Sequence, residues 1–297
     1  MNLPSLSKIQ QQLAEQGYIS DDAITMSLHL SQMLQKPLLV EGPAGVGKTE
    51  IAKVLATLHD TELIRLQCYE GLDVNHSLYE WNYQKQLLYL KMSEQLQESI
   101  DQKEKQIFSD DFLLKRPLLK AITSQKRPVL LIDELDRADE EFESFLLELL
   151  SDWQITIPEI GTIKAQAIPQ VVITSNRVRE LSDALRRRCL YLWIDYPSLE
   201  KELEIIYHKV PDINKQLAQQ IAKFMQEVRK LRLDKVPGTA ETLDWARALA
   251  SMHIDHLDKP LISQTLGLII KDWQDTRHLQ DSLSELWEKT GVSSKLN

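Results

Sequence analysis

Apolar residues occur in the first two thirds of the chain as short runs that alternate with segments of helical periodicity. Each run is bounded by turn or charged residues, as is typical of buried strands. Strands that alternate with helices favour a parallel sheet wrapped by helices, which is an α/β fold. The runs expected to form strands are residues 37–41, 62–67, 128–133, 170–175 and 190–195.

After Pro197 the pattern changes to helical spacing with little strand signal. We expect helices over residues 212–231, 239–252 and 261–273, and two more within residues 5–35. The change of pattern divides the chain into an α/β domain of residues 1–196 and a smaller, all-helical domain of residues 197–297.

Composition narrows the class of protein. The chain has 297 residues, 43% of them hydrophobic and 27% charged, which is ordinary for a globular protein. A formal net charge of −9 weighs against a protein that coats nucleic acid. No apolar run approaches the roughly 18 residues of a membrane span, and residues 1–5 lack the layout of a signal peptide. Two distant cysteines, Cys68 and Cys189, predict no disulfide framework and a cytoplasmic location.

A glycine-rich octapeptide of the form G-x-x-x-x-G-K-T follows the first expected strand and precedes a helical pattern. This is the phosphate loop of nucleotide-binding proteins, in which backbone N–H groups and a helix N-terminus point at phosphates. Lys48 then reaches the β- and γ-phosphates, and Thr49 ligates Mg²⁺. The alternative is a glycine turn that merely precedes a Lys-Thr pair. The octapeptide consists of Gly42, Pro43, Ala44, Gly45, Val46, Gly47, Lys48 and Thr49.

Two carboxylates, Asp133 and Glu134, end the expected strand of residues 128–133. Mg²⁺ prefers oxygen ligands, so Asp133 can hold its coordination shell beside Thr49. Glu134 can polarise the attacking water, because phosphoryl transfer depends mainly on positioning and charge stabilisation. Alternatively, one of the two carboxylates only caps the following helix. The phosphate loop upstream favours the catalytic interpretation.

Polar residues also flank the last two expected strands. One follows the strand of residues 170–175, and a run of arginines precedes the strand of residues 190–195. If the strand of residues 170–175 lies beside that of Asp133, the amide of Asn176 can orient the water, although Asn is also a common turn residue. The run Arg186, Arg187 and Arg188 precedes the final strand. Such a run is often only a charged surface exposed to solvent. In a nucleoside triphosphatase, however, it indicates an arginine finger, which one subunit can supply to the active site of its neighbour.

Taken together, these motifs resemble those of the AAA+ ATPases, more narrowly the MoxR family and its CoxD-like subgroup, which is associated with carbon monoxide dehydrogenase maturation. The resemblance implies an αβα core with a parallel sheet and a helical lid, assembled as a homo-oligomeric ring, commonly a hexamer. It assigns Glu134 to water activation, Asn176 to sensor 1, and Arg188 or, as second choice, Arg187 to the finger. The supporting segments are residues 42–49, 63–73, 79–83, 131–138, 174–176, 185–188 and 236–246.

The family also carries two insertions and a further arginine. The resemblance implies a helical insert at about residues 80–115 and a hairpin before sensor 1 at about residues 154–165, where the sequence alternates. Many relatives place a sensor-2 arginine just after the proline that opens a lid helix. Here Pro237 is followed by Gly238, and Arg247 lies further along the expected helix.

One further pair of residues has the spacing of a metal site. His253 and His256, with Asp255 between them, fit the spacing of metal ligands on a helix face, although a solvated helix end explains them as well.

Three functions are compatible with these motifs. The first is an ATP- and Mg²⁺-dependent remodelling chaperone that acts, by family analogy, on a metalloenzyme or protein complex with a partner carrying a von Willebrand factor A (VWA) domain. The second is a DNA-directed motor, which the hairpin suggests, although residues 155–164 hold one Lys and one Glu and suit DNA phosphates poorly. The third is a nucleotide-gated switch with little turnover, which the missing sensor-2 arginine keeps open.

Overall fold

The computed structural model describes residues 6–73, 77–93 and 99–290 of the chain. Residues 1–5, which were expected not to form a signal peptide, and residues 94–98 of the expected insert lie outside the described residues. By their internal contacts the described residues form two units. The first contains residues 6–22, 42–48 and 194–290, and the second contains residues 23–41 and 49–193.

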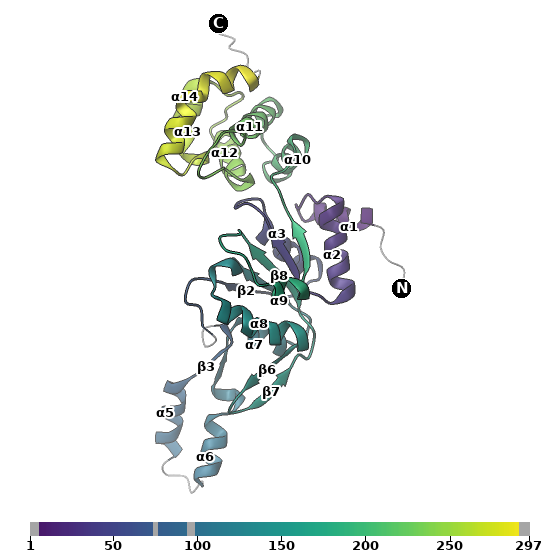
Figure 1. Cartoon of the computed structure of the whole chain (residues 1–297), viewed down its shortest axis with the longest axis vertical. Coiled ribbons are helices and arrows are strands. Elements are labelled where there is room, and N and C mark those ends of the chain that lie inside the picture. Colours follow the sequence, from purple (N-terminus) through teal and green to yellow (C-terminus); the bar gives the residue numbers. More distant parts are fainter. Residues whose placement is uncertain (1–5, 74–76, 94–98, 291–297) are drawn as a thin grey trace. The chain divides into compact units, whose positions relative to one another are not determined.

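A five-stranded parallel sheet forms the centre of the second unit (Figure 1). Its strands lie in the order β2-β5-β8-β1-β9, so the strand that precedes the phosphate loop has β8 and β9 as neighbours. Each strand lies within one of the five apolar runs. Their bounds are β1 Leu38–Glu41, β2 Leu63–Gln67, β5 Val129–Asp133, β8 Gln170–Ser175 and β9 Leu190–Trp193.

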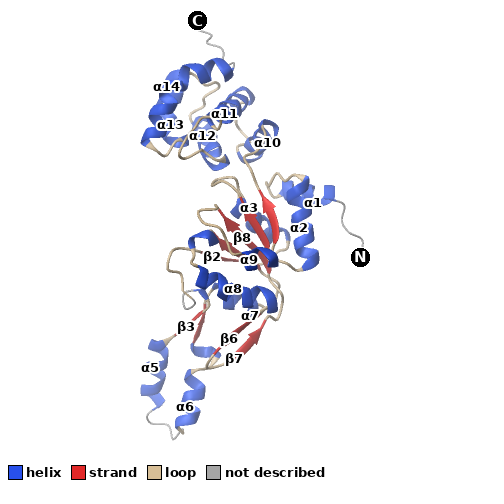
Figure 2. Ribbon diagram, in the orientation of Figure 1, coloured by secondary structure: helices blue, strands red, loops and turns tan. Residues whose placement is uncertain are grey.

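Both faces of this sheet are buried, which is why its central strands are continuously apolar. One face, with Leu39, Leu130 and Ile173, packs into a core together with the buried side chains of α7, α8 and α9. The other face, with Leu38 and Leu131, is equally buried and lies toward α2 and α3 (Figure 2). The helices of these layers are α2 Asp22–Leu34, α3 Lys48–Leu58, α7 Pro117–Thr123, α8 Glu140–Asp152 and α9 Asp183–Arg188.

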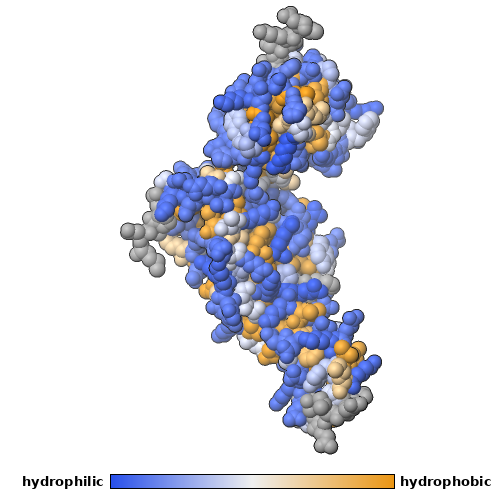
Figure 3. Space-filling model, turned by 180° about the vertical axis from the view of Figure 1, so that it is seen from behind, coloured by the Kyte–Doolittle hydropathy of each residue, from blue (hydrophilic) through white to orange (hydrophobic). Residues whose placement is uncertain are grey.

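The region expected to hold a helical insert is a two-stranded antiparallel ribbon that carries two helices. Asn82 caps the first helix, and Ser99 with Gln102 forms a capping box on the second. Large apolar side chains of this pair remain exposed, including Leu88 at 59% and Ile100 at 82% (Figure 3). The elements are β3 Tyr79–Trp81, α5 Tyr83–Met92, α6 Ile100–Ile107, the 3₁₀ turn η2 Asp110–Phe112 and β4 Leu113–Lys115.

An antiparallel hairpin of β6, Gln154–Ile157, and β7, Gly161–Lys164, occupies the segment where a hairpin was expected. It begins where Trp153 adopts left-handed backbone angles and ends α8, and its turn closes at Gly161, whose φ is 95°. The local chain reversal therefore follows from a helix stop and a glycine turn.

Five helices of the first unit share a separate apolar core, which includes Phe224 and Trp245. Within it, Glu202 and Arg229 form a buried ion pair, with Nη2 to Oε1 at 2.6 Å and Nη1 to Oε2 at 2.7 Å. Thr242 also donates to Glu202, so one buried carboxylate joins three helices. The helices are α10 Leu199–Lys209, α11 Lys215–Val228, α12 Thr239–Ser251, α13 Lys259–Ile269 and α14 Trp273–Thr290; α1, Leu6–Glu15, belongs to the same unit.

Candidate active site

The glycine-rich octapeptide forms the turn between β1 and α3. Gly45 has a φ of 76°, a left-handed conformation that costs glycine little. Lys48 is buried, and its Nζ donates to the carbonyls of Gly42 at 2.8 Å and Pro43 at 2.6 Å. The ammonium group is thus held against the loop itself.

The N-terminus of α12 packs directly against this loop within the first unit. Ala240 N–H donates to the carbonyl of Gly45 at 3.0 Å, and a Cβ added to Gly238 would stand 2.6 Å from the carbonyl oxygen of Ala44. The side chain of Glu241 accepts from Gly238 N–H at 2.8 Å and closes the helix end. Glycine at positions 45 and 238 therefore allows two backbones to touch, which sequence reasoning did not anticipate.

Asp133 ends β5 and lies in the second unit with Thr49, the first residue after the loop's lysine. Its side chain is almost fully buried, and its Oδ1 accepts from Thr49 Oγ1 at 3.0 Å and Thr174 Oγ1 at 2.6 Å. A carboxylate beside a hydroxyl is a hard-oxygen donor set that suits Mg²⁺, which completes its shell with water and phosphate oxygens. No cluster of three or more His, Cys, Asp or Glu side chains in the described part of the chain is arranged as a metal site of its own.

The other oxygen of Asp133 is bound by a residue that the sequence analysis gave no role. Arg65 on β2 donates to Oδ2 through Nε at 3.1 Å and Nη2 at 2.6 Å. Its Nη2 also donates to Gln67 Oε1 at 2.5 Å. Strand β2 pairs with β5 so that Gln67 stands opposite Asp133, which explains why alternate side chains of β2 reach the carboxylates.

Glu134 follows Asp133 in a left-handed conformation, with φ 55° and ψ 49°. Such a conformation is strained for a glutamate and is commonly retained where function requires it. Three side chains hold its carboxylate: Asn176 Nδ2 at 3.4 Å, Gln67 Nε2 at 3.3 Å and Arg137 Nε at 2.7 Å. The structure therefore brings Asn176 to Glu134, as expected if β8 lies beside β5.

Asp136 positions the backbone that carries Asn176. This buried carboxylate accepts from the N–H groups of Asn176 at 3.1 Å and Val178 at 2.8 Å through Oδ2. In the sequence, Asp136 is only an acidic residue three positions after Asp133. The fold shows that its carboxylate binds the backbone on both sides of Arg177.

The three consecutive arginines have different surroundings. Arg186 is paired with buried Glu41 at the end of β1, with Nη2 to Oε1 at 3.2 Å. Arg188 donates to Ser151 Oγ at 2.6 Å and to the carbonyl of Ala184 at 2.9 Å. Arg187 is exposed, and its side chain makes no hydrogen bond or ion pair with the residues that the structure describes.

Burial, together with the nearby carboxylates of Asp133, Asp136 and Glu134, raises the pKa of the Cys68 thiol to about 12. A thiol in this setting stays protonated at neutral pH. Cys68 therefore has the character of a packing residue behind the carboxylates and not of a nucleophile.

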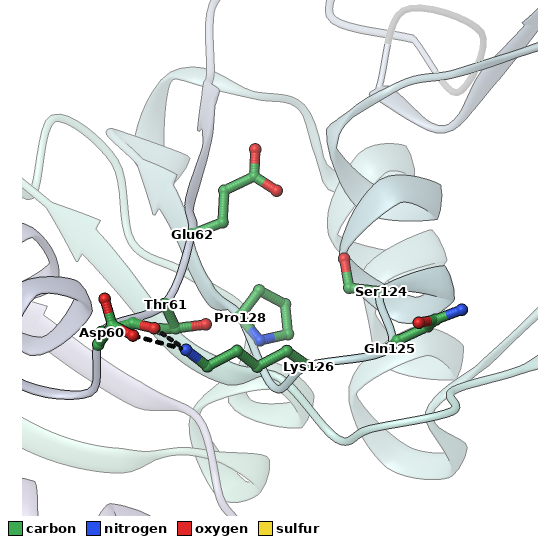
Figure 4. A pocket seen from close by; sticks show the side chains of 7 residues that line it. All are labelled: Asp60, Thr61, Glu62, Ser124, Gln125, Lys126 and Pro128. Atoms are coloured by element: carbon green, nitrogen blue, oxygen red, sulfur yellow. Dashed lines mark hydrogen bonds and ion pairs between the residues drawn. The ribbon is translucent and has the colours of Figure 1, made fainter.

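Two other features lie apart from the expected site residues. His253 and His256 follow the end of α12 at Ser251, and His253 has a φ of 55°, so the two do not share a helix face. A hollow of about 450 Å³ opens where β2 and β5 begin, and Lys126 crosses it to Asp60 (Figure 4). That is the opposite end of these strands from Asp133, whereas ligands of parallel sheets bind at the carboxyl ends.

Comparison with known proteins agrees with the motifs. A model of the AAA domain family, dynein-related subfamily, matches residues 37–189. Gas vesicle ATPase GvpN of Haloferax mediterranei is 24% identical over 285 residues, which cover 91% of this chain and 79% of that protein. An uncharacterized protein of Staphylococcus epidermidis is 25% identical over 274 residues, which cover 90% of this chain and 95% of that protein.

A solved structure confirms the expected fold. A point mutant of Thermotoga maritima RuvB aligns with a TM-score of 0.50 and 19% identity over 97% of this chain and 82% of that chain. At this identity the likeness concerns the fold alone: a parallel sheet between helices, followed by a helical region. Among the residues that the structure describes, no helix combines the length and the apolar character that crossing a membrane requires.

Proposed function

This chain belongs to the AAA domain family, in the dynein-related subfamily, and on that premise we propose that it is an ATPase that couples hydrolysis to the remodelling of another protein. The observation that carries the proposal is the group around β5. Asp133 is buried beside the hydroxyl of Thr49, and Glu134 is held by Asn176 and Gln67. These are the side chains that phosphoryl transfer to water requires at one place.

Each residue has a defined part in the proposed reaction. The N–H groups of residues 42–49 and the ammonium of Lys48 bind the phosphates of ATP. Thr49 and Asp133 would hold Mg²⁺, which neutralises charge on the phosphate oxygens. Glu134 orients the attacking water and takes up its proton, while Asn176 keeps the carboxylate of Glu134 aimed.

The cation that stabilises the transition state comes, in our proposal, from a neighbouring copy of the chain. Arg186 is engaged by buried Glu41 in its own subunit. Arg188 remains the first choice by its place before β9, and exposed Arg187 is the second. A finger supplied in trans requires a homo-oligomer, for which we propose a hexameric ring of the MoxR type.

The proposed client is a protein complex or a metalloenzyme, reached through a partner with a VWA domain, as in the MoxR family and its CoxD-like subgroup. One relative of this chain, at 24% identity, is named a gas vesicle ATPase, which supports the ATPase part of the proposal. The hairpin of β6 and β7 adds no support for a DNA-directed motor, because its strands and turn contain one Lys and one Glu.

Steady-state ATP hydrolysis, measured across a wide range of protein concentration, tests the proposal. Specific activity should rise with concentration, because the active site is shared between subunits. Glu134→Gln should keep nucleotide binding, measured with a fluorescent ATP analogue, and lose hydrolysis. Glu141→Gln is the matched control, since it makes the same charge change on the exposed side of α8 and should leave turnover unchanged.

Three results would count against parts of the proposal. Failure of the wild-type protein to bind ATP would refute an ATPase. Unchanged turnover in Glu134→Gln would remove that residue as the base. Tight binding with low turnover at every concentration would favour the nucleotide-gated switch. A separate pull-down with ATP-loaded Glu134→Gln tests the partner, and recovery of no VWA-domain protein would argue against the MoxR-type assignment.

A further inference from the structure

Arg65 connects an edge strand to a deeply buried carboxylate of the site, that of Asp133. It lies on β2, the outermost strand of the sheet on that side, and its side chain is 52% exposed while that of Asp133 is 4% exposed. We propose that Arg65 is the resident counter-ion of Asp133 and competes there with the divalent cation. It would thereby set the Mg²⁺ concentration that the nucleotide site needs.

Asp133 requires such a counter-ion whenever the divalent cation is absent. A buried carboxylate without a partner is strongly destabilising, and hydroxyl donors satisfy only part of its hydrogen-bonding capacity. Thr49 and Thr174 both donate to Oδ1. Within the described residues, Oδ2 has Arg65 alone as its hydrogen-bonding partner, through two N–H groups of one guanidinium.

The same contact weakens the pull of Asp133 on Mg²⁺. Arginine keeps its charge at every physiological pH, so the Arg65–Asp133 pair as a whole carries little net charge. A guanidinium next to the carboxylate also repels a divalent cation that approaches the same group. About half of the Arg65 side chain is exposed to water, however, which screens the repulsion and lets the side chain swing away when the cation binds.

Gln67 links this exchange to the proposed base. Its Oε1 accepts from Arg65 Nη2, and its Nε2 donates to Glu134. When Arg65 leaves Asp133, the side-chain amide of Gln67 would therefore lose its hydrogen bond from Arg65, and this is the amide that binds Glu134. Arg65 acts through Asp133 and Gln67, which makes it a positioning residue.

The inference rests on the proposed function, because it takes Thr49 and Asp133 as the cation site. Its test is the binding of Mn²⁺, a paramagnetic substitute for Mg²⁺, to the full-length protein with saturating ADP. Electron paramagnetic resonance counts the free Mn²⁺ and needs no turnover. We expect Arg65→Gln to bind Mn²⁺ about tenfold more tightly than wild type, and Arg65→Lys, which keeps the charge, to stay within about threefold of wild type.

Arg116→Gln is the matched control. Arg116 is 41% exposed and pairs with Glu80 beside the β3–β4 ribbon, so its loss removes the same charge from an ion pair of a different element. Its Mn²⁺ affinity should equal that of wild type.

The outcomes separate the two claims. Wild-type protein that binds ADP without any effect of Mn²⁺ refutes the proposed cation site, and with it this inference. Normal Mn²⁺ binding by wild type with equal or weaker binding by Arg65→Gln overturns the inference alone. If Arg65→Gln does not fold, the Mn²⁺ affinity of Arg65→Lys is the deciding measurement. A change in that affinity of more than about tenfold in either direction overturns the proposed competition.

Discussion

Gly238→Ala probes the contact between the lid helix α12 and the phosphate loop. Gly238 has a φ of −87°, which any residue adopts, so the substitution does not strain the backbone. The added methyl group, however, would stand 2.6 Å from the oxygen of Ala44 and 2.8 Å from the Cα of Gly45. Both neighbours are backbone atoms and cannot rotate away, unlike the end of a side chain.

The size of the effect follows from these distances. To reach ordinary van der Waals contact at 3.4 Å, α12 and the loop must separate by about 0.8 Å. The 3.0 Å hydrogen bond from Ala240 N–H to the carbonyl of Gly45 would then lengthen beyond a useful distance. Overpacking of this kind costs about 1–3 kcal/mol, and loss of the hydrogen bond costs about 1 kcal/mol more.

Two measurements on the same protein test this reasoning. Thermal unfolding without nucleotide should show a lower Tm for Gly238→Ala. Calorimetric titration with ADP should show an affinity about tenfold weaker, because the loop is displaced from the shape that α12 holds. Gly267→Ala is the matched control: no atom stands within 4 Å of its added methyl, it lies inside α13, and replacing a helical glycine should stabilise by about 0.5–1 kcal/mol. Equal Tm and equal ADP affinity for Gly238→Ala and wild type would refute the contact.

Three further predictions concern other elements. Arg229→Met leaves the buried carboxylate of Glu202 uncompensated and should lower the free energy of unfolding by about 3–5 kcal/mol, measured by denaturant titration; a loss below 1 kcal/mol would contradict the buried pair. Because the pKa of Cys68 is raised to about 12 from 9.0, its thiol should react slowly with thiol reagents at pH 8 until the protein unfolds. The contribution of the protonated thiol to the free energy of unfolding should be intact below about pH 9 and be lost as the pH rises toward 12. Fast labelling of Cys68 in the native protein would contradict this prediction. Whichever of Arg188 and Arg187 supplies the finger, its substitution by Ala should abolish concentration-dependent hydrolysis. Mixing that variant with Glu134→Gln should restore part of the activity, because each variant supplies what the other lacks. No rescue in either mixture would argue against a finger in trans.

The place of the candidate site residues was predictable where it depends on residues adjacent in the sequence. A strand, a glycine-rich turn and a helix occupy consecutive positions, so the run from Gly42 to Thr49 identifies a phosphate loop by spacing alone. The carboxylates of Asp133 and Glu134 were predictable for the same reason, since an apolar strand ends immediately before them. The position of Asn176 could be predicted only on the condition that β8 lies beside β5, and the order of the strands satisfies this condition.

Other residues of the site could not be predicted because their partners are distant in the chain. Arg65 reaches Asp133 across a separation of 68 residues, and Arg186 reaches Glu41 across 145. In the sequence, Arg65 is one charged residue in an alternating strand, and only the pairing of β2 with β5 aims it at the carboxylate. The pattern at Gly238 likewise indicated a helix start, without any sign that another backbone lies against it.

The sequence by itself determined the elements of this protein and the identity of most residues of its candidate site. Continuous apolar runs select the central strands and helical periodicity selects the helices, because burial of a whole run, or of every third and fourth residue, depends on residues close together in the chain. The tertiary structure alone decided the strand order, the counter-ion of Asp133, the partners of Glu134 and the contact between α12 and the phosphate loop. These depend on how crossovers arrange strands that are not consecutive in the chain, and on which backbones can approach closely once the two cores have formed.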